Sequence, residues 1–137
     1  MSMNELISKE EIDFKAWEPR VQNRFICYIN GIPSYVIKSI DRPVYNKKTK
    51  KWRPIVATFY EPIGTNVVHD LYKLPEPFDT TVKMLGPVGD VIDQYTMKDC
   101  RIRIVAPGIL NWSDNGNPCL TTAKIEYRGV KFKKCRT

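Results

Sequence analysis

The chain has 137 residues, enough for one domain built around one hydrophobic core. Its 42% hydrophobic content argues against wholesale disorder, and no apolar run approaches the roughly 20 residues that span a membrane. The first twenty residues are charged and lack the apolar stretch of a signal peptide, so we expect a protein made in a cytoplasm, without a membrane anchor. The net charge of +7 indicates either an anionic neighbour, such as nucleic acid or an acidic protein face, or simply a soluble basic surface.

Residues 1–20 are predicted to form an N-terminal arm, separate from a β domain at residues 21–137. Ser8 and Glu11 have the spacing of a helix start, and Pro19 ends any helix there. A helix this short needs a surface to pack on, so we expect Phe14 and Trp17 to dock on this subunit or on a neighbour.

The β domain begins with a strand at 23–30, whose apolar residues alternate on two faces that we expect to be covered. The dipeptide Asn30-Gly31 favours a tight hairpin, which predicts that 34–40 returns as the partner strand. A further strand is expected over 52–59, with Ile55, Ala57 and Phe59 on one side.

Between these strands lies a basic stretch that we expect to project from the body as a loop or long β-hairpin at residues 41–54. It holds six basic residues and no acid from 42 to 53: Arg42, Lys47, Lys48, Lys50, Lys51 and Arg53. Such a segment is either a solvated loop or a contact arm.

The second half of the chain predicts one helix and a β-meander. Apolar residues recur at helical spacing over 65–74, with Thr65 or Asn66 as N-cap and His69 as an ordinary helix residue. A hairpin is expected at 80–85 and 91–97, then a turn at Lys98-Asp99 and a strand at 100–105. The last strand or pair of strands covers 120–132, with a bulge at Gly129 where the alternation changes phase. The alternating charged positions of these strands are Arg101, Arg103, Lys124, Glu126 and Arg128.

The sequence predicts no enzyme, no cofactor and no metal site. The four cysteines Cys27, Cys100, Cys119 and Cys135 are scattered without C-x-x-C spacing, and no phosphate-binding glycine loop or catalytic triad pattern is present.

Several short motifs occur in a characteristic order. The opening strand and turn read N-R-F-x-x-x-I-x-G-I-P-x-x-x-I-x-S-x-x-x-P from Asn23 to Pro43. They are followed by L-x-P-x-G at Leu85, G-x-L-x-W-S at Gly108 and x-I-x-Y before Arg128. Over about residues 21–133 this order resembles the tail tube proteins of contractile-tailed bacteriophages.

The resemblance implies a mainly β fold, a β-sandwich or open barrel with one short flanking helix. It further implies hexameric rings with a shared β-barrel lumen that stack into a structural conduit of the virion. The partners would be other copies of the chain, the tail sheath, baseplate and neck proteins at the tube ends, and double-stranded DNA passing without sequence-specific binding.

The resemblance also suggests roles for single residues. The basic stretch from Arg42 to Arg53 would contact an adjacent ring or the sheath, as would the basic tail 131–136. The charged strand positions 101, 103, 124, 126 and 128 would face either the lumen or the outside. Cys119 lies beside turn residues and Cys135 in a basic tail that favours the thiolate, so both are candidates for disulfides between subunits.

Three other functions remain open from the sequence. A baseplate tube initiator or a tail terminator would share the fold without polymerising alone, and a secretion-system tube protein would share both fold and assembly. A basic nucleic-acid-binding β-barrel would need aromatic side chains between basic ones on a strand face. Arg101 and Arg103 have none between them on their face, which argues against that function.

Overall fold

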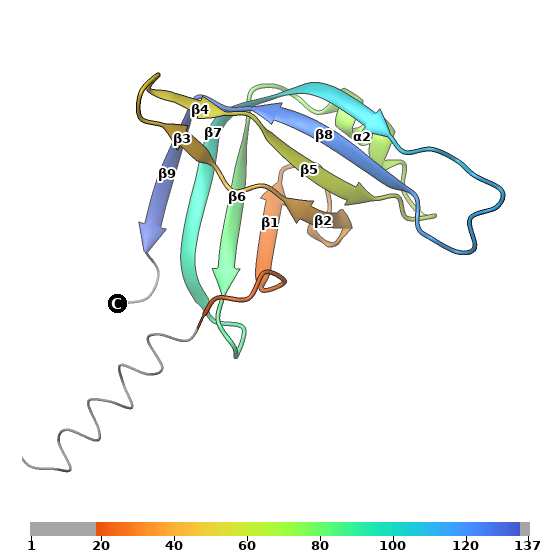
Figure 1. Ribbon diagram of the computed structural model, residues 1–137, viewed down its shortest axis with the longest axis horizontal. Helices are drawn as coiled ribbons and strands as arrows, with labels where there is room; N and C mark the ends of the chain where they lie inside the picture. Colours follow the sequence, from red (N-terminus) through yellow and green to blue (C-terminus); the bar gives the residue numbers. More distant parts are fainter. Residues whose placement is uncertain (1–18, 135–137) are drawn as a thin grey trace, which may run out of the picture.

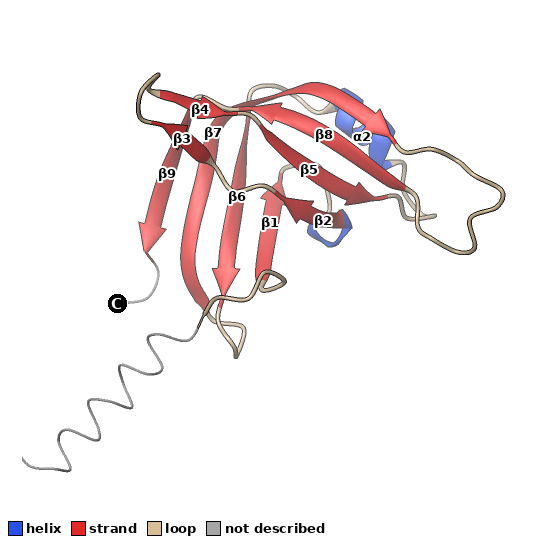
Figure 2. Ribbon diagram, viewed as in Figure 1, coloured by secondary structure: helices blue, strands red, loops and turns tan. Residues whose placement is uncertain are grey.

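The computed structural model describes residues 19–134, which form two main β-sheets, a separate two-stranded sheet and one short α-helix (Figure 1, Figure 2). The strands are β1 (Phe25–Ile29), β2 (Ile37–Ile40), β3 (Val44–Asn46), β4 (Lys51–Arg53), β5 (Ile55–Tyr60), β6 (Phe78–Leu85), β7 (Val91–Pro107), β8 (Leu120–Glu126) and β9 (Gly129–Lys134). The helical segments are the 3-10 turn η1 (Ser34–Val36) and the α-helix α2 (Val67–Lys73). The expected mainly β fold with one short helix is confirmed.

Two antiparallel sheets share the long strand β7. Sheet I has the strand order β1-β6-β7-β9, and sheet II has the order β2-β5-β8-β7. β8 and β9 follow one another along β7, with Glu126 opposite Arg101 and Gly129 opposite Lys98. The two sheets therefore pack as an open sandwich with one continuous strand along one side, and the β3–β4 hairpin forms a small sheet of its own (Figure 1).

The core lies between the sheets, where strand alternation places the apolar side chains. Ile55, Ala57 and Phe59 of β5 are buried, as the sequence predicts for one face of this strand. The facing positions Ala123 and Ile125 of β8 are also fully buried. These positions form one cluster with residues from β1, β6, β7 and α2, so the sandwich has a continuous interior.

Helix α2 begins where the sequence predicts. The Asn66 side-chain oxygen accepts a hydrogen bond from the backbone N–H of His69 (3.1 Å), which caps the first turn. Val67 and Leu71 are buried against the core, while His69 is exposed. The helix thus covers the sandwich with one apolar face.

The predicted hairpin between the first two strands is wrong. Gly31 does adopt a positive φ of 92°, as the Asn30-Gly31 turn requires. The chain then makes only one bridge, Ile29 to Ile32, before η1 carries it to the other sheet. β1 pairs with β6, and β2 pairs with β5. The chain passes from one sheet to the other at η1 because the Val36 side chain is buried in the core and does not lie on a hairpin surface.

The predicted turn at Lys98-Asp99 is a bend inside β7. Asp99 has a φ of 54°, and the register on β6 shifts nearby, between Phe78 and Thr80. The strand then continues to Pro107 and moves from sheet I to sheet II. The predicted phase change at Gly129 falls at the matching break between β8 and β9, where the Arg128 N–H donates to the Lys98 carbonyl (3.0 Å).

The expectation that both faces of the first strand are covered is also wrong within this subunit. Cys27 and Ile29 are buried, but Tyr28 on the opposite face is 44% exposed. No helix within residues 19–134 has the length and apolar character needed to cross a membrane.

Candidate interaction surfaces

Sheet I ends in two strands whose outer edges have no strand partner among residues 19–134. β1 pairs only with β6, and β9 pairs only with β7. Sheet II has less accessible edges: β2 is short and irregularly paired, and the Ile102 N–H on the free side of β7 donates to the Glu76 carboxylate (2.8 Å). Unpaired N–H and C=O groups at an edge are a template for another strand, so sheet I offers the better edges for a partner chain.

The outer face of sheet I is polar and carries lysines. Two cross-strand rows lie on it: Ile26, Lys83, Gln94 and Lys133, and Tyr28, Thr81, Thr96 and Lys131. The Lys83 ammonium lies 5.3 Å from the centre of the Tyr28 ring, and the Thr81 and Thr96 hydroxyls are 3.1 Å apart. This face suits contact with water and with anionic groups.

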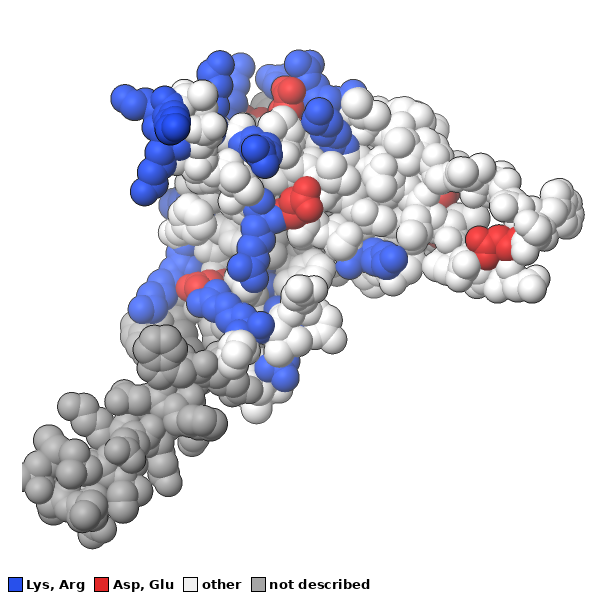
Figure 3. Space-filling view, viewed as in Figure 1, with Lys and Arg blue, Asp and Glu red and all other residues white. Residues whose placement is uncertain are grey.

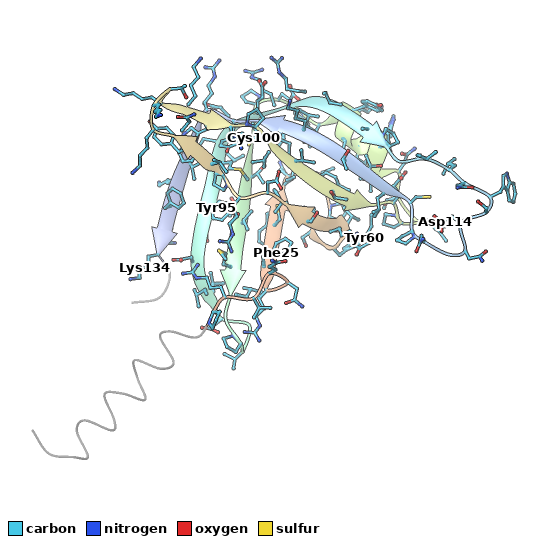
Figure 4. The ribbon with its side chains drawn as sticks, viewed as in Figure 1. Phe25, Tyr60, Tyr95, Cys100, Asp114 and Lys134 are labelled. Carbon is cyan, nitrogen blue, oxygen red and sulfur yellow. The ribbon has the colours of Figure 1, made fainter. Side chains whose placement is uncertain are left out.

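A groove of about 1060 Å³ opens on the inner face of sheet I, next to β1. Its lining includes the sheet I side chains Phe25, Cys27, Val82, Met84 and Tyr95, and the side chains Ile37, Ile40 and Tyr60 of sheet II. Figure 4 labels Phe25, Tyr60 and Tyr95, which come from three strands around it. Arg20 lies at the groove, where it pairs with Asp93 and contacts the Met84 sulfur (3.4 Å). The groove is thus an apolar slot with a charged rim, adjacent to an open strand edge.

Phe132 is an exposed apolar residue at the opposite edge of sheet I from the groove. It lies on β9 in the same cross-strand row as Tyr95, Val82 and Cys27, so its side chain points to the inner side of sheet I. Its ring centroid is 6.2 Å from that of Tyr95, yet Phe132 is 68% exposed. An exposed phenylalanine beside an open edge indicates a contact surface.

The basic stretch forms the hairpin of β3 and β4, as expected for residues 41–54. The candidate contact residues Lys47, Lys48, Lys50, Lys51 and Arg53 are all exposed on it or at its turn, and Arg42 precedes it. Lys50 adopts a φ of 57° at the turn. The Trp52 ring lies between Tyr45 (4.9 Å) and the core residue Tyr127 (5.9 Å), so aromatic packing fixes the hairpin to the body.

The charged strand positions of the second half gather at one end of sheet II's outer face. Arg101 lies opposite Glu126, and the Arg103 guanidinium pairs with the Glu126 carboxylate (2.9 Å). Lys124 lies opposite Val56 and Ile104, while Arg128 is exposed at the break between β8 and β9. The arginine and lysine charges are thus partly balanced by Glu126, unlike those of the hairpin.

The loop between β7 and β8 exposes large apolar side chains. Ile109, Leu110 and Trp112 are 96%, 83% and 103% exposed. Ile63, in the loop after β5, is also fully exposed, at 107%. This loop lies at the same end of sheet II, since the Glu61 N–H donates to the Cys119 carbonyl (3.2 Å). We call Ile63 and residues 108–119 the apolar tip.

The cysteines occupy two kinds of environment. Burial raises the pKa of Cys27 to about 12, with a further contribution from nearby Cys100. Burial also raises the pKa of Cys100, whose sulfur accepts from the Thr80 hydroxyl (3.5 Å). Cys119 is exposed in the apolar tip, where it is accessible to a second thiol.

The N-terminal arm and the last residues carry predictions that lie outside the described residues. These are the docking of Phe14 and Trp17 and the disulfide at Cys135. Within residues 19–134, no group of three or more His, Cys, Asp or Glu side chains is arranged to hold a metal ion.

No protein-family profile matches the sequence, and no curated protein matches it. Solved structures do match by shape. A chain of the sheath–tube complex of the extracellular contractile injection system PVC has a TM-score of 0.68 and 11% identity, covering 90% of this chain and 97% of that chain. The tube-terminating cap of the anti-feeding prophage has a TM-score of 0.65 and 12% identity, covering 86% of this chain and 93% of that chain.

Hcp1 from Salmonella typhimurium matches with a TM-score of 0.55 and 15% identity, covering 80% of this chain and 86% of that chain. The chain has the fold shared by Hcp and contractile injection system proteins. At these identities the likeness concerns the fold, which agrees with the fold implied by the sequence resemblance.

Sequence reasoning located the basic hairpin but missed the groove, Phe132 and the apolar tip as surfaces. The groove depends on the pairing of β1 with β6 and of β2 with β5, which no local pattern reports. The apolar tip had a signal in the sequence, because three large apolar residues stand within the turn-rich stretch 108–118.

Proposed function

We propose that this chain is the tube-forming subunit of a contractile injection-type assembly, and that the assembly is the tail of a bacteriophage. The observation that carries the proposal is a fold shared with proteins of contractile injection systems, in a chain whose sheet I has two accessible edges. The order of the sequence motifs supports the tail tube of a phage virion. The function is structural and needs no catalytic residue.

The ring would close through sheet I. Its four strands alternate in direction, so β9 of one copy and β1 of the next run antiparallel when placed side by side. Six copies joined in this way form one uniformly antiparallel barrel, which leaves no open edge. Head-to-tail contacts of this kind give cyclic symmetry when the rotation closes.

Edge pairing would also fill the groove. Phe132 points to the inner side of sheet I, so on a neighbour's β9 it would lie over the groove beside β1. Its exposed ring would then be buried against Phe25, where aromatic contacts are favourable. The polar outer face of sheet I would line the lumen.

If the outer face of sheet I lines the lumen, Lys83, Lys131 and Lys133 lie around the channel. We infer that the cargo is anionic, as the double-stranded DNA of a phage genome is, and that its passage depends on salt. The basic hairpin would contact the adjacent ring or an acidic lining of the sheath, and baseplate and neck proteins would bind the two tube ends.

Substitution of Phe132 tests ring closure. We expect Phe132→Arg to remain folded and to lose rings in negative-stain electron microscopy, because a charge would enter the apolar groove. The matched control is Val88→Arg, at a position 88% exposed in the β6–β7 turn, which should form rings. Normal rings from Phe132→Arg would contradict closure through β9 and the groove.

A tube initiator or terminator is the second candidate, since the likeness to the anti-feeding prophage cap nearly equals that to the PVC chain. A protein in that role would form rings that do not stack unless tube subunits are added. The length of the assemblies formed by the purified protein separates the two functions.

A further inference from the structure

The groove beside β1 opens where the described chain begins. Arg20 lies at its rim in contact with the Met84 sulfur (3.4 Å), and the Arg24 carbonyl accepts from the Leu85 N–H (2.9 Å). These contacts hold the start of the domain against sheet I, between β1 and the β6–β7 turn (Figure 1). Residues 1–18 therefore join the domain at the mouth of the groove.

The groove has an apolar floor that the described residues leave partly uncovered. Phe25, Ile40 and Met84 line it, and each packs on the core while remaining partly exposed. Tyr60 and Tyr35 also line the groove and are 38% and 70% exposed. The volume of about 1060 Å³ matches that of a pocket for a drug-sized ligand, so more than one aromatic side chain fits.

The rim of the groove is basic. Arg24, Lys38 and Arg42 line it, and none of the three takes part in an ion pair with another described residue. The lining acid Asp41 accepts a hydrogen bond from the Val56 N–H (3.0 Å). A basic rim around an apolar floor favours a segment that combines aromatic side chains with carboxylates.

The sequence that precedes the described residues has this chemistry. Residues 1–18 hold five acidic side chains against two lysines. Phe14 and Trp17 are three residues apart, so they share one side of the helix that the sequence predicts there. Four of the five acids stand around these two aromatic residues: Glu10, Glu11, Asp13 and Glu18.

The connection is long enough for both aromatic side chains to reach the groove of the same subunit. Three residue steps separate Trp17 from Arg20, and six separate Phe14 from Arg20. These steps span at most about 11 Å and about 22 Å when extended. A segment attached at the mouth of the groove is also present at a high effective concentration.

We propose that the N-terminal arm of a free subunit docks in the groove of its own sheet I, with Phe14 and Trp17 on the apolar floor and its carboxylates at the basic rim. In the proposed ring, Phe132 of the neighbouring copy occupies the same floor beside Phe25. The arm and Phe132 therefore compete, and the arm leaves the groove when the ring closes. The docking stands without the proposed function, whereas the competition rests on it.

Hydrogen–deuterium exchange of the full-length protein, at a concentration low enough to keep it monomeric, tests the docking. The amides of residues 10–18 should exchange about tenfold or more slowly in the wild type than in Phe14→Ser/Trp17→Ser, which lacks both aromatic anchors. The matched control Tyr72→Ser/Trp112→Ser removes two exposed aromatic residues elsewhere and should keep the slow exchange. Equal exchange in the wild type and the arm variant would overturn the docking.

Charge reversal at the rim tests where the arm docks. Lys38→Glu/Arg42→Glu should remain folded, because both side chains are exposed, and should speed exchange of residues 10–18 by repelling the carboxylates of the arm. Lys47→Glu/Lys48→Glu makes the same change in net charge on the basic hairpin and should leave that exchange slow. Unchanged slow exchange in the rim variant would place the arm on another surface and overturn the inference.

Negative-stain electron microscopy tests the competition. Phe14→Ser/Trp17→Ser should form rings at a protein concentration about tenfold or more below that of the wild type, because closure no longer displaces a docked arm. Tyr72→Ser should match the wild type. Rings at an unchanged or higher concentration would overturn the competition. A wild type that protects its arm but never forms rings would contradict the proposed function and leave the docking standing.

Discussion

The buried thiol of Cys27 makes the stability of the fold depend on pH. The pKa of Cys27 lies at about 12, above its ordinary 9.0, because burial disfavours the thiolate and Cys100 is close. Below pH 9 the thiol is protonated in both folded and unfolded chains, so its contribution to stability is fully present. As pH rises from 9 towards 12, the unfolded chain loses a proton that the folded chain keeps, and stability falls.

We predict that Cys27→Ala reduces this alkaline loss. The wild type should lose about 1.4 kcal/mol of unfolding free energy per pH unit above pH 9 through this group. Cys27→Ala should be less stable at pH 7, because it leaves a small cavity, but the difference should narrow by pH 11. Burial also raises the pKa of Tyr95 to about 12, so the variant retains part of the pH dependence. Denaturant midpoints for both proteins give the comparison, and a constant gap from pH 7 to 11 would contradict the prediction.

Thiol labelling provides a second test at the residue scale. With burial raising the pKa of both Cys27 and Cys100, neither should react with an aromatic disulfide reagent at pH 8 while the protein is folded. Cys119 is exposed and should react quickly. We expect Cys119→Ser to remove one thiol from the fast phase, and an unchanged fast phase would show that Cys119 is protected.

At the scale of elements, the bend in β7 depends on one residue. Asp99 adopts a φ of 54° in the middle of a strand that passes from one sheet to the other. Asp99→Gly should be tolerated, whereas Asp99→Val should cost about 1–2 kcal/mol of unfolding free energy, because a β-branched residue is disfavoured there. Gln94→Val on the same strand is the control, and chemical denaturation measures all three. Equal stability of the glycine and valine variants would remove this account of the bend.

The basic hairpin makes the second prediction at this scale. Changing Lys47, Lys48, Lys50 and Lys51 together to Glu should leave the fold intact, since all four are exposed. It should disrupt tube polymerisation or sheath assembly, because the hairpin would then repel an acidic partner surface. Lys73→Glu on α2 is the control for charge reversal elsewhere. Unchanged assembly of the fourfold variant, seen by electron microscopy with and without sheath protein, would end the contact role of the hairpin.

The elements also show what a sequence can and cannot predict. Local signals located the β5 alternation, the Asn66 cap and the β6–β7 hairpin, because each depends on residues close in the chain. The Asn30-Gly31 signal predicted the turn but not the pairing, since β2 reaches β5 only through long-range packing. Local alternation also predicted the charged strand positions and the apolar face that holds Phe132. It did not predict the groove or the exposure of Phe132, because both depend on which strands pair and which edges stay open.

At the scale of the whole molecule, the surfaces are arranged for directional assembly. Sheet I presents open edges on β1 and β9, while sheet II separates the basic hairpin from the apolar tip (Figure 1, Figure 3). Pairing of the sheet I edges of neighbouring copies would give a ring, and the basic hairpin would contact the adjacent ring.

In the proposed function, this chain assembles into six-fold rings that stack into a tube. Negative-stain electron microscopy of the purified full-length protein, over a range of concentrations, tests it most directly. The proposal predicts rings with six-fold symmetry and, at higher concentration, tubes. A protein that remains monomeric at the highest concentration would contradict it.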